Sequence, residues 1–258
     1  MLNRPTASAA VRGPTVELDQ GDLLRIDGHR AAAPHQELLL AVKAAPIVPT
    51  VHPIDVDTLC QFADVLHEEG YPAIELLARP LPQALVLLEE IAKRPQRTKI
   101  RWGLGTIRTA AEARQAVAHS PDFLVSPAFS ERVTQVAVEH GIPYIPGVHS
   151  LQDVQNVFEA FDEHGCKVSI LKLCPVLGVT QQYVTMLLGC FPGIVFCPTG
   201  EVELENYLHW KKMPGIVAPM GSNFVPRQLL ESRDFVAVRS RLRWIRALAD
   251  LAVSSSAS

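Results

Sequence analysis

The sequence predicts an α/β fold, a (β/α)8 or TIM barrel with an N-terminal extension. From about residue 46 onward, short apolar segments typical of buried strands alternate with longer amphipathic segments typical of helices. Eight such pairs follow one another, and parallel strands joined by helical crossovers close into a barrel at that number. Residues that commonly cap helices stand where several helices should begin: Asp55, Thr109, Ser130, Ser150 and Thr180.

The segment before the barrel is expected to be a separate arm. Residues 1–35 are rich in Ala, Pro, Gly and Arg and show little periodicity, although 15–18 and 23–26 could pair as a short hairpin. We therefore expect a partly ordered arm over 1–35 and a single barrel domain over 36–258. A short leading helix over residues 36–43, ended by Pro46, should begin that domain.

The predicted strands and helices alternate along the rest of the chain. Strands are expected at 46–51, 71–77, 99–106, 123–127, 143–148, 167–174, 193–199 and 215–221. Helices are expected at 55–69, 81–94, 109–119, 130–140, 150–164, 180–190, 203–211 and 226–252. The alternative is an open doubly wound sheet, whose dinucleotide-binding form needs a G-x-G-x-x-G turn. The nearest candidate, Gly103-Leu104-Gly105-Thr106, lacks the third glycine, which favours the barrel.

Composition and charge exclude several classes of partner. Of the 258 residues, 48% are hydrophobic and 20% are charged, and the formal net charge of -3 gives no electrostatic case for nucleic acid. No apolar run is long enough to span a membrane, and the N-terminus lacks a secretory signal pattern, so we expect a cytoplasmic protein. The histidines and cysteines show no metal-binding or redox spacing, and we expect neither a metal nor a cofactor.

A lysine inside an apolar segment is the first candidate for chemistry. Residues 168–175 read Val-Ser-Ile-Leu-Lys-Leu-Cys-Pro, with Lys172 as the one charged residue. An ammonium group in a buried strand is costly, and burial favours the neutral, nucleophilic amine. The alternative is a structural lysine whose ammonium group extends out of the barrel.

Polar residues recur at the C-terminal ends of the predicted strands, where barrel enzymes carry their active sites. They are Glu75 and Arg79 at the second strand, Thr106 at the third, Ser126-Pro127 at the fourth, Lys172 at the sixth, Thr199-Gly200 at the seventh and Gly221-Ser222 at the eighth. One lysine, one carboxylate, one arginine and several hydroxyl groups are therefore expected around a common mouth.

Eight short motifs together resemble those of the 2-keto-3-deoxy-6-phosphogluconate (KDPG) aldolase family, which includes 2-keto-4-hydroxyglutarate (KHG) aldolases. They are Ile47-Val48-Pro49, Ile74-Glu75 with Arg79, Gly103-Leu104-Gly105-Thr106, Ser126-Pro127, Ile145-Pro146-Gly147, Leu171-Lys172-Leu173-Cys174-Pro175, Phe196-Cys197-Pro198-Thr199-Gly200 and Gly221-Ser222. Each motif is weak alone, but all eight occur in the right order, each at the strand it should occupy.

The resemblance implies a class I, Schiff-base aldolase that forms pyruvate and an aldehyde of the glyceraldehyde 3-phosphate or glyoxylate type. The substrate would be a 2-keto-3-deoxy-6-phospho sugar acid or a 2-keto-4-hydroxy acid. Lys172 would attack its C2 ketone, and Glu75 would act as general acid and base or, alternatively, form a buried ion pair with Lys172. A homotrimer is also implied. The alternative is a non-catalytic barrel that binds a keto acid or a protein partner.

The resemblance also assigns residues to the substrate. Arg79 would hold the substrate carboxylate, although Ala78 and Pro80 flank it where the family usually has threonines, and a surface arginine is the alternative. Thr106 and Thr199 would fix the carboxylate and the reacting oxygens, and Pro127 would pack over the pyruvyl group. Ordinary packing at strand ends is the alternative for these three.

The phosphate site that the resemblance implies departs from the family pattern. The family has Gly-Gly and Gly-Gly-Ser at the last two strands, whereas this chain has Gly200-Glu201 and Met220-Gly221-Ser222. A carboxylate would repel phosphate, and its side chain would strain a left-handed backbone. We therefore expect weakened phosphate binding and a preference for an unphosphorylated or differently charged keto acid. Alternatively, Glu201 points outward at a helix start, and Gly200 and Ser222 still bind phosphate.

The last predicted helix carries four arginines at mixed spacings, Arg239, Arg241, Arg243 and Arg246. Such a run is usually a solvated helix face. A contact between subunits is the alternative.

Overall fold

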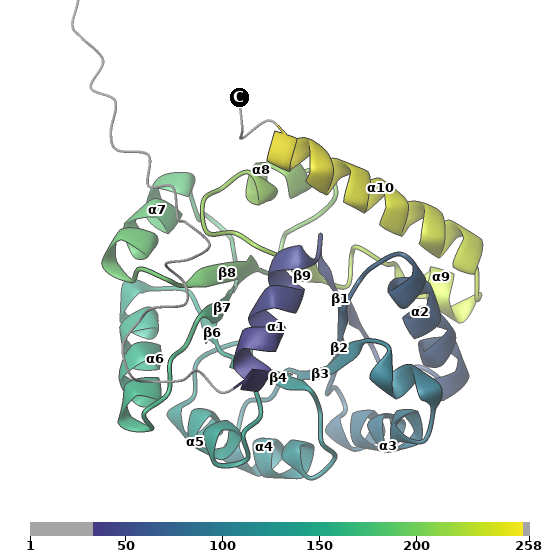
Figure 1. The fold of residues 1–258 in the computed structure, drawn as a ribbon, viewed down its shortest axis with the longest axis horizontal. Helices are drawn as coiled ribbons and strands as arrows, with labels where there is room; N and C mark the ends of the chain where they lie inside the picture. Colours follow the sequence, from purple (N-terminus) through teal and green to yellow (C-terminus); the bar gives the residue numbers. More distant parts are fainter. Residues whose placement is uncertain (1–32, 255–258) are drawn as a thin grey trace, which may run out of the picture.

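The structure is a computed structural model that describes residues 33–254. Within these residues, parallel strands curl around a common centre and most helices lie outside them (Figure 1). One sheet has the strand order β5-β4-β3-β2-β1-β9, and a second has the order β6-β7-β8. The predicted α/β fold with parallel strands is confirmed. Of the arm predicted over 1–35, residues 1–32 with the predicted hairpin lie outside the described residues, and residues 33–35 belong to a helix instead.

The strands follow the predicted order. They are β1 (Val48–Val51), β2 (Ala73–Leu77), β3 (Arg101–Gly105), β4 (Phe123–Val125), β5 (Tyr144–Ile145), β6 (Gly147–Val148), β7 (Ile170–Leu173), β8 (Val195–Pro198) and β9 (Met220–Gly221). An isolated parallel bridge joins Thr199, directly after β8, to Met220 of β9. A single residue, Pro146, separates β5 from β6. The two sheets are therefore connected at both of their edges.

Prolines explain two differences from the predicted strands. The sequence predicts one strand over 143–148, but Pro146 divides it into β5 and β6. Pro219 lies within the strand predicted over 215–221, of which only β9 remains. In both places proline has no N–H to donate to a neighbouring strand.

The outer helices follow the strands, and most of their predicted starts agree with the structure. They are α2 (Val56–Glu68), α3 (Leu81–Ala92), α4 (Ala110–Val117), α5 (Glu131–Glu139), α6 (Leu151–Glu163), α7 (Gln181–Cys190), α8 (Tyr207–Lys211), α9 (Arg227–Glu231) and α10 (Phe235–Ser254), with a 3-10 helix, η2 (Pro95–Thr98), after α3. Each predicted N-cap side chain accepts a backbone N–H from the first turn of its helix. The capping pattern therefore located five helix starts correctly: α2, α4, α5, α6 and α7.

Two predicted helices differ from those in the structure. The helix predicted over 203–211 begins only at Tyr207, because residues 204–206 form a turn. The helix predicted over 226–252 is divided into α9 and α10. Arg233 lies at the break with a left-handed φ of 55°, a conformation that cannot continue a helix.

Helix α1 (Ala33–Ala44) covers one end of the curled strands (Figure 1). Its buried residues Leu38 and Val42 belong to an inner apolar cluster. The same cluster contains the first residues of β1, β2, β4 and β7, which are Val48, Ala73, Phe123 and Ile170. The helix therefore covers the end at which the strands begin, and the strand C-termini point to the opposite end. The predicted leading helix is confirmed, and it starts three residues earlier, at Ala33 rather than residue 36.

Side chains of the strands alternate between this inner cluster and an outer cluster beneath the helices. In β7, Leu171 and Leu173 belong to the outer cluster, and Ile170 belongs to the inner one. Because successive side chains point to opposite faces of a strand, Lys172 points inward with Ile170. The same alternation places Glu75 of β2 inside.

Arginines of α10 attach this helix to the rest of the fold. Arg239 and Arg243 form ion pairs with Glu69 at the end of α2, at 2.6 and 2.9 Å. Arg241 donates a hydrogen bond to the backbone carbonyl oxygen of Phe224, also at 2.6 Å. These arginines are therefore partly solvated, as expected for a helix face, and they also make contacts within the chain. Each exposed pair contributes little alone, but together they fix the orientation of the helix.

Tyr71 provides a buried attachment for the same helix. The side chain is 0% exposed, and its hydroxyl donates to the backbone carbonyl oxygen of Leu242 at 2.6 Å. Tyr71→Phe keeps the ring but leaves that carbonyl without this donor, so the free energy of unfolding should fall by about 1 to 2 kcal/mol. Urea denaturation measures the loss. Tyr183→Phe removes a more exposed hydroxyl that donates to His149 and should cost less; equal losses would contradict the role of burial.

Candidate active site

Lys172 and Glu75 meet inside the curled sheet. Lys172 is 6% exposed and Glu75 is 0% exposed. The Lys172 Nζ and the Glu75 Oε1 lie 3.5 Å apart. Their strands, β7 and β2, belong to different sheets and are not neighbours, so the two side chains meet across the interior. The structure thus brings together the two residues that the sequence singled out as nucleophile and acid/base.

Two neighbours confine the Glu75 carboxylate. The Thr50 hydroxyl, on β1, donates to the Glu75 Oε2 at 2.9 Å. On the other side, a Cβ atom at Gly105 of β3 would overlap the Glu75 Oε1. Glycine at this position therefore makes room for the carboxylate. The sequence interpretation missed Thr50, for which the available signal was a hydroxyl residue in an otherwise apolar first strand.

Thr199 presents an unused hydroxyl beside the strand that carries Lys172. Its backbone N–H donates to the carbonyl oxygen of Leu173 at 2.9 Å. Its Oγ1 is buried and has no hydrogen-bond partner among the residues that the structure describes. Because a buried hydroxyl without a partner is costly, a ligand that bonds to it is favoured. The Thr199 hydroxyl is therefore suited to bind a substrate oxygen.

Arg79, Thr106 and Pro127 follow three adjacent strands, β2, β3 and β4. Arg79 and Pro127 are exposed, and Thr106 is half-buried. Thr106 has a left-handed φ of 64°, which is strained for a β-branched residue, and such strain concentrates at functional sites. A Cβ atom at Gly147 would overlap the carbonyl oxygen of Pro127, so glycine allows this loop to lie against β6.

The loops after β8 and β9 contain the proposed departure from the family pattern. Gly200 and Glu201 have left-handed φ angles of 79° and 59°. Glu201 therefore adopts a backbone conformation suited to glycine, with its side chain exposed. The alternative that Glu201 stands at a helix start is wrong, because α8 begins only at Tyr207. Gly221 and Ser222 are half-buried at the end of β9.

Comparison with known proteins agrees with this arrangement. Residues 39–241 match the family described as KDPG and KHG aldolase. The chain belongs to this family. It is 30% identical over 201 residues to the 2-dehydro-3-deoxy-phosphogluconate aldolase of Treponema pallidum, covering 77% of this chain and 90% of that protein. It is 24% identical over 190 residues to the KHG/KDPG aldolase of Escherichia coli K12, covering 74% and 85%.

Solved structures show the same relationship. A 4-hydroxy-2-oxoglutarate and 2-dehydro-3-deoxyphosphogluconate aldolase superposes with a TM-score of 0.69 at 30% identity, covering 82% of this chain and 98% of that one. The KDPG aldolase of Legionella pneumophila, solved with pyruvate as a covalent carbinolamine, has a TM-score of 0.70 at 22% identity, with 80% and 96% coverage. The second likeness concerns the fold alone. As a member of this aldolase family, the chain is a lyase, which confirms the predicted enzyme class.

Positive charge gathers at the part of the aldolase mouth formed by β1, β2 and β9. His52 directly follows β1 and is half-buried. Burial lowers the pKa of His52, and the nearby charges of Arg227 and Arg79 lower it further. The sequence interpretation singled out neither His52 nor Arg227. The signal for His52 was its place directly after the first strand.

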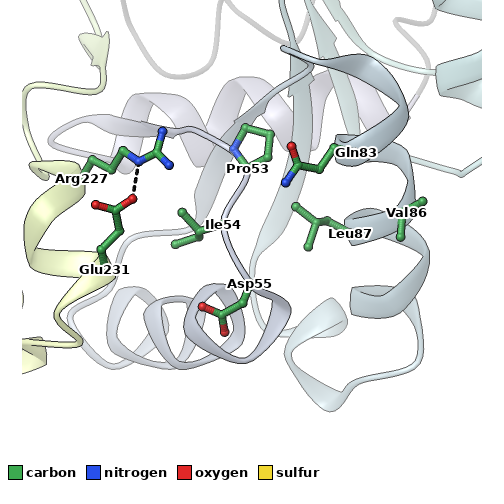
Figure 2. A pocket seen from close by; sticks show the side chains of 8 residues that line it. All are labelled: Pro53, Ile54, Asp55, Gln83, Val86, Leu87, Arg227 and Glu231. Carbon is green, nitrogen blue, oxygen red and sulfur yellow. Dashed lines mark hydrogen bonds and ion pairs between the residues drawn. The ribbon is translucent and has the colours of Figure 1, made fainter.

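A separate cavity of about 620 Å³ lies between the loop after β1, helix α3 and helix α9 of the aldolase (Figure 2). Its lining consists of Pro53, Ile54, Asp55, Gln83, Val86, Leu87, Arg227 and Glu231. Arg227 and Glu231 pair with each other at 2.6 Å, and Asp55 pairs with Arg233 at 3.1 Å. Its charged groups thus already have partners in the chain, and neither Lys172 nor Glu75 lines it.

Over residues 33–254, no three side chains of His, Cys, Asp or Glu gather into a group that could hold a metal ion. In the same part of the aldolase, no helix combines the length and apolar character needed to cross a membrane.

Proposed function

We propose that this aldolase cleaves a 2-keto-4-hydroxy acid or a 2-keto-3-deoxy-6-phospho sugar acid to pyruvate and an aldehyde, with Lys172 as nucleophile and Glu75 as general acid and base. The observation that carries the assignment is the 3.5 Å separation of the Lys172 Nζ and the Glu75 Oε1 at a buried position. A proton shared by this pair can reside on Glu75. Lys172 is then the neutral amine that attack requires.

The proposed reaction begins when the Lys172 amine attacks the C2 carbonyl carbon to form a carbinolamine. Loss of water gives an iminium, which accepts the electron pair of the C3–C4 bond as the C4 hydroxyl loses its proton. The aldehyde departs, the enamine gains a proton at C3, and hydrolysis releases pyruvate and restores the amine. Glu75 is proposed to supply and remove these protons because its carboxylate lies beside the Lys172 nitrogen.

The substrate-binding residues are proposals supported by their local geometry. Arg79 has no ion-pair partner among the described residues, so its guanidinium is available for the substrate carboxylate. The buried Oγ1 of Thr199 and the strained backbone of Thr106 support roles in fixing substrate oxygens. Pro127 is proposed to pack over the pyruvyl group.

We propose that phosphate binding at the distal end of the substrate is weakened and that an unphosphorylated or differently charged keto acid is preferred. Gly200, Gly221 and Ser222 remain candidates for contact with that end, but Glu201 adds a carboxylate to their loop. Repulsion between unit charges 4 Å apart is about 1 kcal/mol even in water. Pyruvate release from KHG and KDPG compares the two substrate classes directly. A strong preference of the wild-type enzyme for KDPG would contradict this part of the proposal.

Glu201→Gly and Glu201→Gln test the contribution of this carboxylate. Both variants should lower the KM for KDPG about fivefold or more, because a charge repelling phosphate is removed, and should lower the KM for KHG less, because its distal carboxylate carries a single charge. Glu201→Gly should also raise stability slightly, since glycine adopts the left-handed backbone without strain. Glu205→Gln, at an exposed position in the next turn, is the matched control and should change neither KM.

We also propose that the two sheets form one closed (β/α)8 barrel, as the bridge between Thr199 and Met220 supports.

Three further proposals concern the whole protein: a single domain over 36–258, a homotrimeric assembly and a cytoplasmic location. Sedimentation of the purified enzyme tests the trimer. Membership of an aldolase family and the buried Lys172–Glu75 pair favour catalysis over the alternative of a non-catalytic barrel.

A further inference from the structure

We propose that Thr50 is a positioning residue, which orients the Glu75 carboxylate so that one of its two oxygens exchanges protons with Lys172 and the substrate. This inference rests on the proposed roles of Lys172 and Glu75. Thr50 acts through Glu75 and makes no assigned contact with the substrate.

The geometry separates the two oxygens of Glu75. Thr50 and Glu75 lie side by side in register on the parallel strands β1 and β2. The Thr50 Oγ1 donates to Oε2 at 2.9 Å, while Oε1 faces the Lys172 Nζ at 3.5 Å. Gly105 leaves space for Oε1 in this orientation. One oxygen is therefore anchored and the other is turned toward the reacting nitrogen.

The hydrogen bond also determines where an acidic proton resides. While the Thr50 hydroxyl donates to Oε2, that oxygen acts as an acceptor, and a proton on Glu75 belongs on Oε1. Without the hydroxyl, the carboxyl group loses its anchor and can rotate within its cavity. Proton transfer depends on this orientation, because donor and acceptor must approach to within hydrogen-bond distance.

Packing alone does not explain a threonine at this position. Thr50 is 6% exposed, and valine would fill nearly the same volume without burying a hydroxyl. Its neighbours in β1 include Val48 and Val51, both buried. The cost of burying the hydroxyl is offset only through its bond to Glu75, which is the one partner that the structure gives it.

The titratable groups that face Glu75 are Lys172 on β7 and the thiols of Cys197 on β8 and Cys174 after β7. Burial raises the pKa of both thiols, so they remain neutral near pH 7. Loss of the Thr50 hydroxyl therefore changes the surroundings of Glu75 without adding or removing a charge, and the pH–rate profile reports that change.

Thr50→Val and Thr50→Ser separate this role from packing. We expect kcat of Thr50→Val to fall about tenfold, the effect of losing one hydrogen bond to a charged group, with an altered pH–rate profile. Thr50→Ser keeps the hydroxyl and should restore both properties. Thr134→Val is the matched control, since Thr134 is also buried and donates to the Ser130 carbonyl oxygen; its pH profile should remain that of the wild type.

Two outcomes would overturn the inference. Wild-type kcat and pH profile in Thr50→Val would show that Glu75 does not need the hydroxyl. Equal losses in Thr50→Val and Thr50→Ser with an unchanged pH profile would assign Thr50 to packing. Trapping of pyruvate on the wild-type enzyme with borohydride distinguishes these results from failure of the proposed function, in which the wild type itself would not be labelled.

Discussion

Lys172→Met should abolish both aldol cleavage and irreversible labelling by pyruvate with borohydride. Reduction traps the iminium as a stable secondary amine on the residue that formed it, and methionine has no nitrogen to form one. We expect kcat to fall about a thousandfold or more, as is usual when a covalent nucleophile is removed. Peptide mapping by mass spectrometry should locate the wild-type adduct on Lys172.

Methionine is chosen because it retains the shape of the lysine side chain beside Glu75. Removing one partner of a buried pair leaves the other without compensation, but the Glu75 carboxyl can take up a proton and become neutral. Lys172→Arg is a second variant that keeps the positive charge without a nucleophilic amine, and it should also resist labelling. Thermal unfolding of both variants verifies that they are folded.

Lys211 provides the control for this experiment. It lies at the end of α8, donates to the Val217 carbonyl oxygen at 2.9 Å, and has a pKa lowered by burial. Because its pKa is lowered, a larger fraction of the Lys211 side chain is the neutral amine than in an exposed lysine. Lys211 is therefore a second amine that could react with pyruvate. Lys211→Met should retain labelling in full. An adduct on Lys211 in the wild type, or labelling of Lys172→Met, would contradict the assignment.

The buried, inward-facing position of Lys172 could be predicted from the sequence because two local patterns coincide there. Apolar residues on both sides indicated a buried strand, and a charge in such a strand is costly enough to need a reason. Alternation with a period of two then places Lys172 and Ile170 on one face, as the inner apolar cluster bears out. No information from distant parts of the chain was necessary.

The Thr50 contact could not be predicted in this way. Its bond to Glu75 depends on the register between β1 and β2, which side-chain packing across the whole sheet determines. The left-handed backbone of Thr106 likewise follows from the path of the loop after β3, since its own side chain disfavours it. Residues that act through such contacts carry little signal in their own segment.

The breaks in predicted elements have a related cause. The strand predicted over 143–148 followed from the apolar residues of this segment, although Pro146 lies among them. In the structure its carbonyl oxygen accepts the backbone N–H of Lys172 at 2.9 Å. A proline can accept in a ladder although it cannot donate. The break between β5 and β6 thus still supports the strand that carries Lys172, the proposed nucleophile.

Glu75→Gln should lower kcat about a hundred- to ten-thousandfold, the range associated with loss of a general acid/base. Glutamine has nearly the same shape, and its amide oxygen can accept the Thr50 hydrogen bond while fitting beside Gly105. The amide cannot take up or deliver a proton near pH 7. The expected loss is therefore one of chemistry, and thermal unfolding should show the variant folded.

The two active-site variants should fail in different ways. Glu75→Gln retains the Lys172 amine, so prolonged incubation with pyruvate and borohydride should still label it, more slowly than the wild type. Exchange of the pyruvate C3 hydrogens for solvent deuterium, followed by NMR, should be lost along with cleavage, because protonation of the enamine carbon needs the carboxyl group. Glu69→Gln, which alters a carboxylate paired with α10 instead, should leave exchange unchanged. If Glu75→Gln exchanged deuterium at the wild-type rate, another group would have to move the proton at C3.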